Sequence, residues 1–334
     1  MTELQQSTVS LRDERSGLEA SFVPGAGMLC SSLRHHGAEL LAQNDGVGAY
    51  ARHGTTMGIP LLYPWANRLA GFDYAVAGRT VELPSDPGRI AVEEHGLPIH
   101  GVIGGRLAWE LAHASGTPAR ASGPPAQSLT ARLSWSESRP ELFEVFPFRH
   151  DLRYEARLGG GRLEVQITVH ACGADPVPVA FGFHPYLSLA DAAREHWLIE
   201  LPAMRHLALD DHQIPLGTGQ AHEAQRFELA AREFDDGFDA VTEPARFSAT
   251  AGRRVALEFL QGYPCAQVFA PRASQFICFE PMTASGRCGE VRDEEPAYHS
   301  GPHLSVPANA VTAGEHARML PDAPPACLRA GEID

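Results

Sequence analysis

Apolar and polar residues alternate with a period of two along several stretches of the chain, which is the pattern of a β-strand with one buried face. In residues 163–170, every second residue from Leu163 to Val169 is leucine, valine or isoleucine, and the residues between them are polar. Residues 129–135 show the same alternation. Four further stretches have the composition of strands: residues 150–158, 255–260, 266–269 and 276–279. We therefore expect strands to be the main element of the fold.

Turn-forming residues separate these stretches, whereas helical patterns are rare. The best helical candidate is residues 224–233, and its periodicity is weak. Many strands divided by glycine- and proline-rich turns predict an all-β fold, a large antiparallel sandwich or barrel, and all-β domains of this size commonly stay single. We expect one domain over residues 1–320 and a disordered, Pro- and Ala-rich tail over residues 321–334.

Charge and composition exclude several functional classes. The formal net charge of −14 disfavours nucleic acid, polyanions and anionic membranes as partners, because these bind to basic surfaces. The chain contains no lysine, so all 27 of its Lys and Arg residues are arginine. Schiff-base aldolases and pyridoxal-phosphate enzymes need a lysine amine, and Walker-type NTPases need the lysine of the phosphate loop, so these classes are excluded.

Targeting and metal-binding patterns are missing from the sequence. No apolar stretch approaches the roughly 18 residues of a transmembrane helix, and the first residues lack the basic and apolar regions of a signal peptide. We therefore expect a cytoplasmic protein, a monomer or homodimer, that does not bind membranes. The six cysteines are scattered without a C-x-x-C pair, which argues against a disulfide framework and a structural zinc site.

Two apolar segments contain polar residues that are candidates for binding. In residues 58–69, Asn67 and Arg68 follow an apolar run. The Arg68 guanidinium can bind vicinal hydroxyls or a carboxylate of a ligand. Alternatively, it donates hydrogen bonds to backbone carbonyls of its own loop. In residues 97–101, His100 stands beside a glycine, and taken alone this pattern favours a structural histidine.

A third segment, residues 181–187, surrounds His184 with aromatic residues. Pro185 prevents this segment from continuing as a central strand. An imidazole surrounded by aromatic residues is either a hydrogen-bonded core group or a proton donor directed into a pocket. The second role is open to histidine because it gains and loses a proton near neutral pH.

The fourth segment ends in the strongest single candidate of the chain. Residues 276–279 form an apolar run that leads to Glu280, and Pro281 is expected to stop the strand. A carboxylate at the end of a buried strand is costly unless it is paired. Partial desolvation raises its pKa from about 4.3 toward neutral pH, as a general base requires.

A weaker signal is the acidic stretch at residues 234–241, which holds Asp235, Asp236 and Asp239 around a glycine. Alone, it favours a solvated turn. Its spacing does not match a calcium-binding EF-hand loop, which needs a closing glutamate.

Together these motifs resemble the aldose 1-epimerase (galactose mutarotase-like) family, in which they occur in the same order: GIPLLYPWANR, LPIHG, FGFHPYL, FDDGF and CFEPMTA. The resemblance runs from about Phe22 to about Met319 and includes Ala313-Gly314-Glu315, similar to a Pro-Gly-Glu turn of the family. It implies the family fold, a galactose mutarotase-like β-supersandwich, in agreement with the strand pattern. The chain departs from the family after CFEPMTA, where it continues SGRCGE, and at Leu187, which replaces the more usual phenylalanine.

The resemblance also implies roles for individual residues. Glu280 matches the glutamate that takes the proton of the C1 hydroxyl, His184 matches the histidine that protonates the ring oxygen, and His100 matches a second histidine near the same oxygens. Arg68 and Asp235 match residues that bind sugar hydroxyls.

Three further residues complete the expected site. Asp235 fits the family's Asp-x-x-Phe pattern, closed here by Phe238, and Asp236 is an alternative one position away. We expect Asn67 and Trp65, which lie in the same motif as Arg68, to contact the sugar.

We therefore expect an aldose 1-epimerase that interconverts the α and β anomers of a hexose, a small-molecule substrate, without a metal or other cofactor. One base and one acid at the anomeric centre suffice for ring opening and closing. A competing hypothesis is a hexose-6-phosphate 1-epimerase of the same fold, whose phosphate would need convergent arginines, with candidates at Arg149/Arg153 and Arg253/Arg254.

Two further hypotheses keep a sugar as ligand but change the chemistry. A non-catalytic sugar-binding protein would have no use for both Glu280 and His184. A glycoside hydrolase would use Glu280 with Asp235 on either side of one bond, and would leave His184 without a role.

Overall fold

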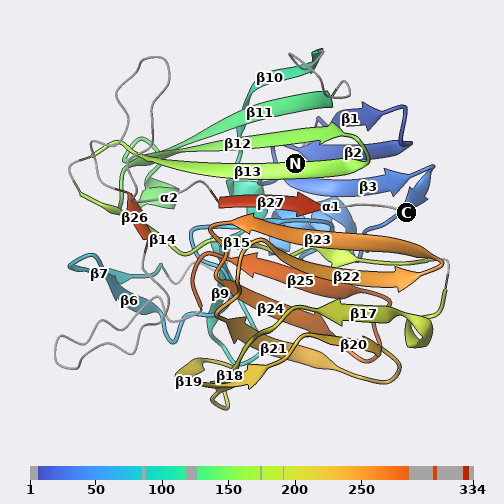
Figure 1. Ribbon diagram of the computed structural model, residues 1–334. Helices are drawn as coiled ribbons and strands as arrows, with labels where there is room; N and C mark the ends of the chain where they lie inside the picture. The colour runs from blue at the N-terminus through green and yellow to red at the C-terminus, as the bar shows by residue number, and fades with distance from the viewer. Residues whose placement is uncertain are drawn as a thin grey trace.

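The computed structural model describes residues 7–84, 88–117, 126–173, 175–190, 192–285, 304–306 and 326–330, and strands dominate them (Figure 1). Its helical segments are short: α1 (Gly46–His53), α2 (Pro140–Phe143) and the 3₁₀ turns η1 (Gly104–Arg106) and η2 (Arg194–His196). No helix in these residues has the length and apolar character needed to cross a membrane.

The largest sheet has nine antiparallel strands in the order β10-β11-β12-β13-β27-β23-β22-β17-β20. The alternation predicted for residues 163–170 is confirmed, since Leu163, Val165 and Ile167 are buried. The strands are β10 (Glu110–Thr117), β11 (Ala126–Trp135), β12 (His150–Gly159), β13 (Arg162–Ala171), β17 (Leu198–Leu201), β20 (Gln225–Glu228), β22 (Ala245–Ala251), β23 (Arg253–Gln261) and β27 (Ala326–Ala330).

The second large sheet carries the polar motifs. Its order is β19-β18-β21-β24-β25-β15-β5, with β16 also paired to β25. Its strands are β5 (Leu61–Leu62), β15 (Gly182–Phe183), β16 (Tyr186–Leu187), β18 (Met204–Leu209), β19 (Pro215–His222), β21 (Phe234–Asp239), β24 (Cys265–Ala270) and β25 (Ile277–Met282).

Smaller sheets surround these two. A four-stranded sheet contains β1 (Val9–Asp13), β2 (Leu18–Val23), β3 (Leu29–His35) and β4 (Ala38–Glu39). The two-stranded sheets are β6 (Asp73–Val76) with β7 (Arg79–Glu82), β8 (Ile90–Val92) with β9 (Pro98–Val102), and β14 (Val177–Val179) with β26 (Leu304–Val306).

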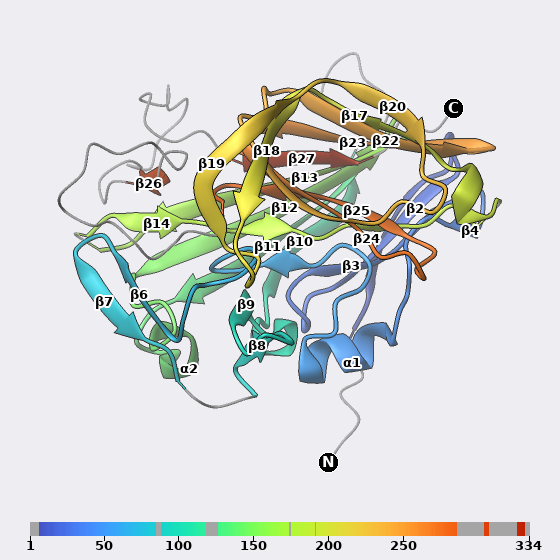
Figure 2. The ribbon, with the colours of Figure 1, turned by 90° about the horizontal axis from the view of Figure 1, so that it is seen from below.

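The two large sheets pack face to face, as Figures 1 and 2 show from perpendicular directions. Aromatic side chains from the two sheets contact each other. The ring centroids of Phe247 on β22 and Phe279 on β25 are 5.4 Å apart, and those of Tyr154 on β12 and Phe183 on β15 are 6.5 Å apart. Tyr154 also contacts Phe22 of the four-stranded sheet. Burial of such large rings is the main stabilising contribution to this core. The predicted all-β antiparallel sandwich is confirmed.

Two local predictions were wrong, and the weak helical candidate is not a helix. Residues 224–233 contain no helix, because the edge strand β20 pairs there with β17. Strand β25 does not stop at Pro281, because proline removes one donor but keeps an extended backbone, and pairing resumes at Met282. Within the tail expected to be disordered, Ala326–Ala330 forms β27, which bonds to strands on both sides. The rest of that tail and the Ala313-Gly314-Glu315 segment lie outside the described residues.

Candidate active site

Strand register places the acidic and polar candidates on one face of the second large sheet. Gln267 of β24 lies directly opposite Glu280 of β25, and Phe269 of β24 lies opposite both Cys278 and Asp235. Residues that lie opposite one another in paired strands project from the same face, and successive residues alternate. These five side chains therefore point away from the sandwich core.

The same register separates Asp235 from Asp236. Asp236 lies opposite Val268, on the other face of the sheet, and its carboxylate contacts Nε2 of His206 at 2.8 Å. Asp235 faces the Glu280 side instead and lines the same cavity. The structure thus distinguishes the two aspartates between which the sequence does not choose.

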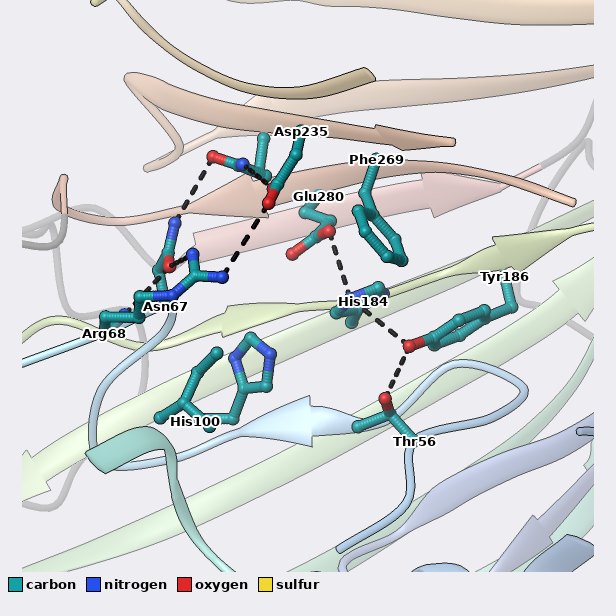
Figure 3. Close-up of a pocket in the computed structure, with 11 residues that line it drawn as sticks. Thr56, Asn67, Arg68, His100, His184, Tyr186, Asp235, Phe269 and Glu280 are labelled. Carbon is teal, nitrogen blue, oxygen red and sulfur yellow. Dashed lines mark hydrogen bonds and ion pairs between the residues drawn. The ribbon is translucent and has the colours of Figure 1, made fainter. Parts of the chain in front are cut away.

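His184 reaches this face from the connection between β15 and β16. Pro185 interrupts the two short strands, so the backbone leaves the sheet where the imidazole projects. The ring of Tyr186 stacks on the imidazole with 4.4 Å between centroids and 4° between planes. The Tyr186 hydroxyl also shares a hydrogen bond with Thr56, which fixes the stacked pair (Figure 3).

His184 and Glu280 form a buried pair. Nε2 of His184 lies 3.1 Å from Oε1 of Glu280, and the two residues are only 5% and 1% exposed. Burial raises the pKa of Glu280 well above its ordinary value, Asp235 raises it further and Arg68 opposes this. Burial lowers the pKa of His184 well below its ordinary value, with a further contribution from His100. Both shifts favour uncharged groups, so the pair holds one proton at neutral pH.

His100 approaches the pair from a strained segment. Its ring centroid lies 5.4 Å from that of His184 at 85° between planes. Burial, assisted by Arg68, lowers the pKa of His100 to about 3. His100 and Asn67 both have positive φ, 61° and 57°, and the His100 N–H donates to the Asn67 carbonyl. Such strain in residues other than glycine is concentrated at functional sites.

Four polar residues form a closed ring of contacts on another wall. Asn67 donates to Gln267, and Gln267 donates to Asp235 at 2.7 Å. Arg68 completes the ring, because its guanidinium lies 3.7 Å from the Asp235 carboxylate and donates to the Asn67 side-chain oxygen. Arg68 also pairs with Glu93 at 3.5 Å. The ring presents donors and an acceptor in fixed positions, as recognition of hydroxyl groups requires.

A cavity of about 210 Å³ brings these groups together. It is lined by Glu280, His184, His100, Arg68, Asn67 and Asp235, six of the seven residues predicted to form the site. Trp65 is not among them: its ring packs against Tyr74 in the core, and its indole Nε1 is buried. The position of Trp65 therefore contradicts a direct contact with the sugar.

Five lining residues were not predicted as site residues: Thr56, Ile99, Tyr186, Gln267 and Phe269. Gln267 had a detectable signal, since it is the only polar residue in an otherwise apolar strand, β24. Tyr186 belongs to the motif that contains His184. Thr56 lies in a connection without a strand pattern, so its place in the site depends on tertiary structure.

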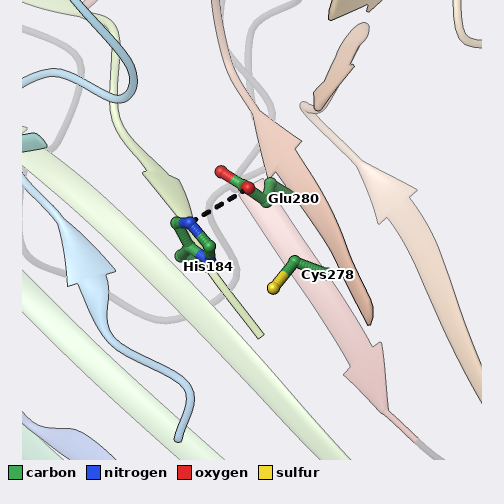
Figure 4. Close-up of side chains that lie close together, drawn as sticks. All are labelled: His184, Cys278 and Glu280. Carbon is green, nitrogen blue, oxygen red and sulfur yellow. Dashed lines mark ion pairs between the residues drawn. The ribbon is translucent and has the colours of Figure 1, made fainter. Parts of the chain in front are cut away.

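One group of side chains in the described residues can hold a metal ion. Ligand atoms of His184, Cys278 and Glu280 lie within 4.8 Å of one another, and all three residues are buried (Figure 4). Imidazole, thiolate and carboxylate are the ligands that Zn²⁺ takes in proteins. Strand alternation brings Cys278 and Glu280 together, although no spacing motif of a zinc site is present.

Comparison with known proteins gives one family. The model of the aldose 1-epimerase family matches residues 8–297. The uncharacterized protein YihR of Escherichia coli K12 is 27% identical over 190 residues, 55% of this chain and 54% of that protein, so the similarity spans about half of this curated relative.

Several solved structures share the fold. A galactose mutarotase-like protein from Clostridium acetobutylicum has a TM-score of 0.75 at 14% identity, covering 96% of this chain and 93% of that one. The Slr1438 protein from Synechocystis sp. PCC 6803 has a TM-score of 0.69 at 20% identity, covering 100% and 97%. The GalM/aldose epimerase homologue from C. elegans has a TM-score of 0.68 at 14% identity, covering 97% of each chain.

Proposed function

This chain belongs to the aldose 1-epimerase family, and we propose that it interconverts the α and β anomers of a hexose by acid–base opening and closing of the sugar ring. The observation that supports this most directly is the buried contact of 3.1 Å between His184 and Glu280 in the wall of the cavity. A base and an acid that share one proton are the groups that an anomeric centre requires.

The proposed reaction starts when the shared proton moves from Glu280 to His184 across their 3.1 Å contact, which leaves a carboxylate and an imidazolium. It then moves one proton on each side of the substrate. The Glu280 carboxylate takes the proton of the C1 hydroxyl, the electrons of that O–H bond form the aldehyde C=O, and the bond from C1 to the ring oxygen breaks. The ring oxygen keeps that electron pair and takes a proton from the His184 imidazolium. Each transfer contributes about 10²–10⁴ to the rate.

Ring closure reverses these transfers after rotation about the C1–C2 bond. The aldehyde oxygen receives the proton from Glu280, and His184 recovers its proton from the hydroxyl group that becomes the ring oxygen. The pair holds one proton before and after each half of the cycle. The enzyme therefore needs no exchange with solvent between opening and closing, which suits a pair withdrawn from water.

The ring formed by Asn67, Arg68, Asp235 and Gln267 would hold the sugar hydroxyls while C1 reacts. His100 would contact the same oxygens as His184 in its neutral form, since its pKa is lowered to about 3. A neutral imidazole donates one hydrogen bond and accepts another, which matches hydroxyl groups.

The charges around the cavity favour a neutral sugar over a sugar phosphate. Among the described lining residues, Arg68 is the one arginine, and it already contacts Glu93 and Asp235. None of the four arginines considered for a phosphate site lines this cavity. Three of them are paired elsewhere: Arg149 with Glu137, Arg153 with Glu155 and Arg254 with Glu200.

Polarimetry distinguishes an epimerase of neutral hexoses from the three competing functions. Freshly dissolved α-glucose, α-galactose and glucose 6-phosphate would be followed with and without protein, and a glycoside would be checked for released sugar. We expect faster mutarotation of the neutral hexoses. Acceleration of the phosphate alone would support the hexose-6-phosphate epimerase, sugar release would support the hydrolase, and binding without acceleration would support the non-catalytic protein.

A further inference from the structure

The Glu93 carboxylate connects two segments of the chain beside the catalytic cavity. Its Oε1 accepts hydrogen bonds from the backbone N–H groups of His95 and Leu97, at 3.0 and 3.1 Å, and closes the turn between β8 and β9. Its Oε2 accepts a hydrogen bond from Nε of Arg68 at 3.5 Å. One carboxylate therefore joins this turn to the arginine that we expect to bind sugar hydroxyls.

The contact between Glu93 and Arg68 is an ion pair withdrawn from solvent. Burial raises the pKa of Glu93, but hydrogen bonds from the N–H groups of Leu97 and His95 and the charge of Arg68 bring it below its ordinary value. Glu93 is therefore a carboxylate at neutral pH. The two side chains are only 9% and 13% exposed, so salt and water screen this pair less than a pair on the surface.

The Arg68 guanidinium is held on three sides. Its Nε faces Glu93, its Nη1 donates to Oδ1 of Asn67 at 3.2 Å, and its Nη2 lies 3.7 Å from the Asp235 carboxylate. Figure 3 shows the last two of these contacts in the cavity wall. Arginine carries five N–H donors in a planar fork, so a guanidinium held in this way presents its remaining donors in a fixed direction. Binding then costs less side-chain entropy.

Glu93 differs from the other two partners of Arg68 in its location. Asn67 and Asp235 line the catalytic cavity, whereas Glu93 is not among the described residues that line it. Glu93 lines a second cavity of about 460 Å³, which shares four lining residues with the first. A monosaccharide in the catalytic cavity would therefore contact Arg68 directly and would be affected by Glu93 through Arg68.

Backbone hydrogen bonds hold the Arg68 segment independently of Glu93. The Leu69 N–H donates to the Pro98 carbonyl at 2.9 Å, and the His100 N–H donates to the Asn67 carbonyl at 3.0 Å. These bonds fix the backbone on both sides of Arg68 but do not orient its side chain. Loss of the Glu93 carboxylate is therefore expected to release the guanidinium while the backbone of the site stays in place.

We propose that Glu93 is a positioning residue, which holds the Arg68 guanidinium in the orientation that binds sugar hydroxyls. This inference rests on the proposed function, because that function assigns the hydroxyls to Arg68. It gives a role in substrate recognition to a buried acid outside the catalytic cavity. It also predicts that Glu93 affects sugar binding more than proton transfer.

Glu93→Gln tests this role, because the amide keeps an oxygen for the turn and places an NH₂ group against Nε of Arg68, a donor against a donor. For the hexose with the fastest mutarotation, we expect KM to rise about tenfold and kcat to change less than about twofold. Glu94→Gln is the matched control, since it makes the same change in a side chain that is 88% exposed and lines neither cavity. Equal KM values for the two variants would overturn the proposal.

A double-mutant cycle tests whether Glu93 acts through Arg68. We expect Arg68→Ala to raise KM at least as much as Glu93→Gln, and the double variant to have the KM of Arg68→Ala alone. Effects that multiply in the double variant would overturn the proposal, because they would mean that Glu93 affects the sugar by a route that does not include Arg68.

Glu93→Asp separates the orientation of Arg68 from the stability of the turn. Aspartate accepts hydrogen bonds from the backbone two residues ahead, so it can still close the turn, but its carboxylate is one methylene further from Arg68. We expect the midpoint of urea unfolding to stay close to that of wild type while KM rises as in Glu93→Gln. A wild-type KM in folded Glu93→Asp would contradict the positioning role.

Isothermal titration calorimetry with the same hexose separates a failed function from a failed positioning role, because it measures Kd without catalysis. We expect Kd to rise about tenfold in Glu93→Gln and to stay unchanged in Glu94→Gln. If wild type does not exchange the anomers, the proposed function is wrong, and the Kd values still test the positioning role. If wild type exchanges the anomers and Glu93→Gln has the same Kd, the positioning role is wrong.

Discussion

Glu280 and His184 face each other across 3.1 Å in a nearly solvent-free wall of the cavity, although they come from distant parts of the chain. Strand alternation orients the carboxylate away from the core, and a proline-interrupted connection delivers the imidazole. Because the two groups act on one shared proton, neither is expected to function without the other.

Glu280→Gln is expected to reduce kcat for mutarotation by at least about 10²–10⁴, because the amide cannot accept the C1 proton. Stopped-flow polarimetry measures this loss, and circular dichroism checks the fold. Glu94→Gln is a control, since the Glu94 side chain is 88% exposed and lines neither cavity. An active Glu280→Gln enzyme would rule out the proposed mechanism.

The same variant is expected to gain stability relative to wild type as pH rises. Glu280 has a raised pKa in the folded state, so the folded protein binds this proton more tightly than the unfolded chain. Wild type therefore loses stability as pH rises from the ordinary value of 4.5 toward the folded value. Glu280→Gln lacks this loss. Urea unfolding of both proteins should give similar stabilities below pH 4.5 and a growing advantage of the variant above it.

The rate of wild type is expected to show a broad plateau against pH. At the acid limit both groups are protonated and Glu280 cannot accept a proton; at the alkaline limit both are deprotonated and His184 cannot donate. The midpoint of the acid limb of kcat/KM should lie below 6.5, the ordinary pKa of histidine. The midpoint of the alkaline limb should lie well above 4.5, the ordinary pKa of glutamate. A single rise centred near 6.5 would instead indicate an ordinary, solvated histidine.

Asp235→Asn and Asp236→Asn form a matched pair for substrate binding. Asp235 lines the cavity and accepts from Gln267, whereas Asp236 lies on the opposite face with His206. Loss of a charged hydrogen-bond partner costs about 1.5–3 kcal/mol, so Asp235→Asn should raise KM about tenfold or more. Asp236→Asn should leave KM unchanged. The reverse order of effects in steady-state kinetics would assign the sugar contact to Asp236.

Gly101→Ala is expected to destabilise the protein and to displace His100. Gly101 has φ of 73°, and an added Cβ would overlap the Tyr63 carbonyl group. We expect a loss of at least about 2 kcal/mol in the free energy of unfolding. Gly25→Ala is the control, because no atom beyond its neighbours in the chain lies within 4 Å of its added Cβ and its φ is not in the left-handed region. Equal unfolding midpoints for the two variants would contradict this packing argument.

Added Zn²⁺ is expected to inhibit the enzyme by binding His184, Cys278 and Glu280. Burial, with Glu280, raises the pKa of the Cys278 thiol, so metal binding must displace a proton and inhibition should strengthen as pH rises. Cys278→Ala should weaken inhibition, while Cys30→Ala, a buried cysteine of β3, should not. Equal zinc sensitivity in the two variants would show that the metal binds elsewhere.

Local sequence predicted the strands well, because alternation is a local property. Residues 163–170 lie in β13 with the expected side buried, and the apolar run before Glu280 lies in β25. Pairing overrides such patterns where backbone groups find partners from distant strands. Strand β27 illustrates this, since it lies in a Pro- and Ala-rich tail but bonds to β13 on one side and β23 on the other.

By itself, the sequence determined the classes of residue available for chemistry. The absence of lysine removed whole reaction types, and the apolar surroundings of Glu280 and His184 marked both as unusual. Tertiary structure decided which candidates meet. Strand register places Asp235 on the same face of the sheet as Glu280 and Asp236 on the opposite face. Trp65 packs against Tyr74 in the core and does not line the cavity, whereas Thr56 does line it. The physical reason is that strand period is set by neighbours in the chain, whereas register and cavity shape are set by contacts between distant segments.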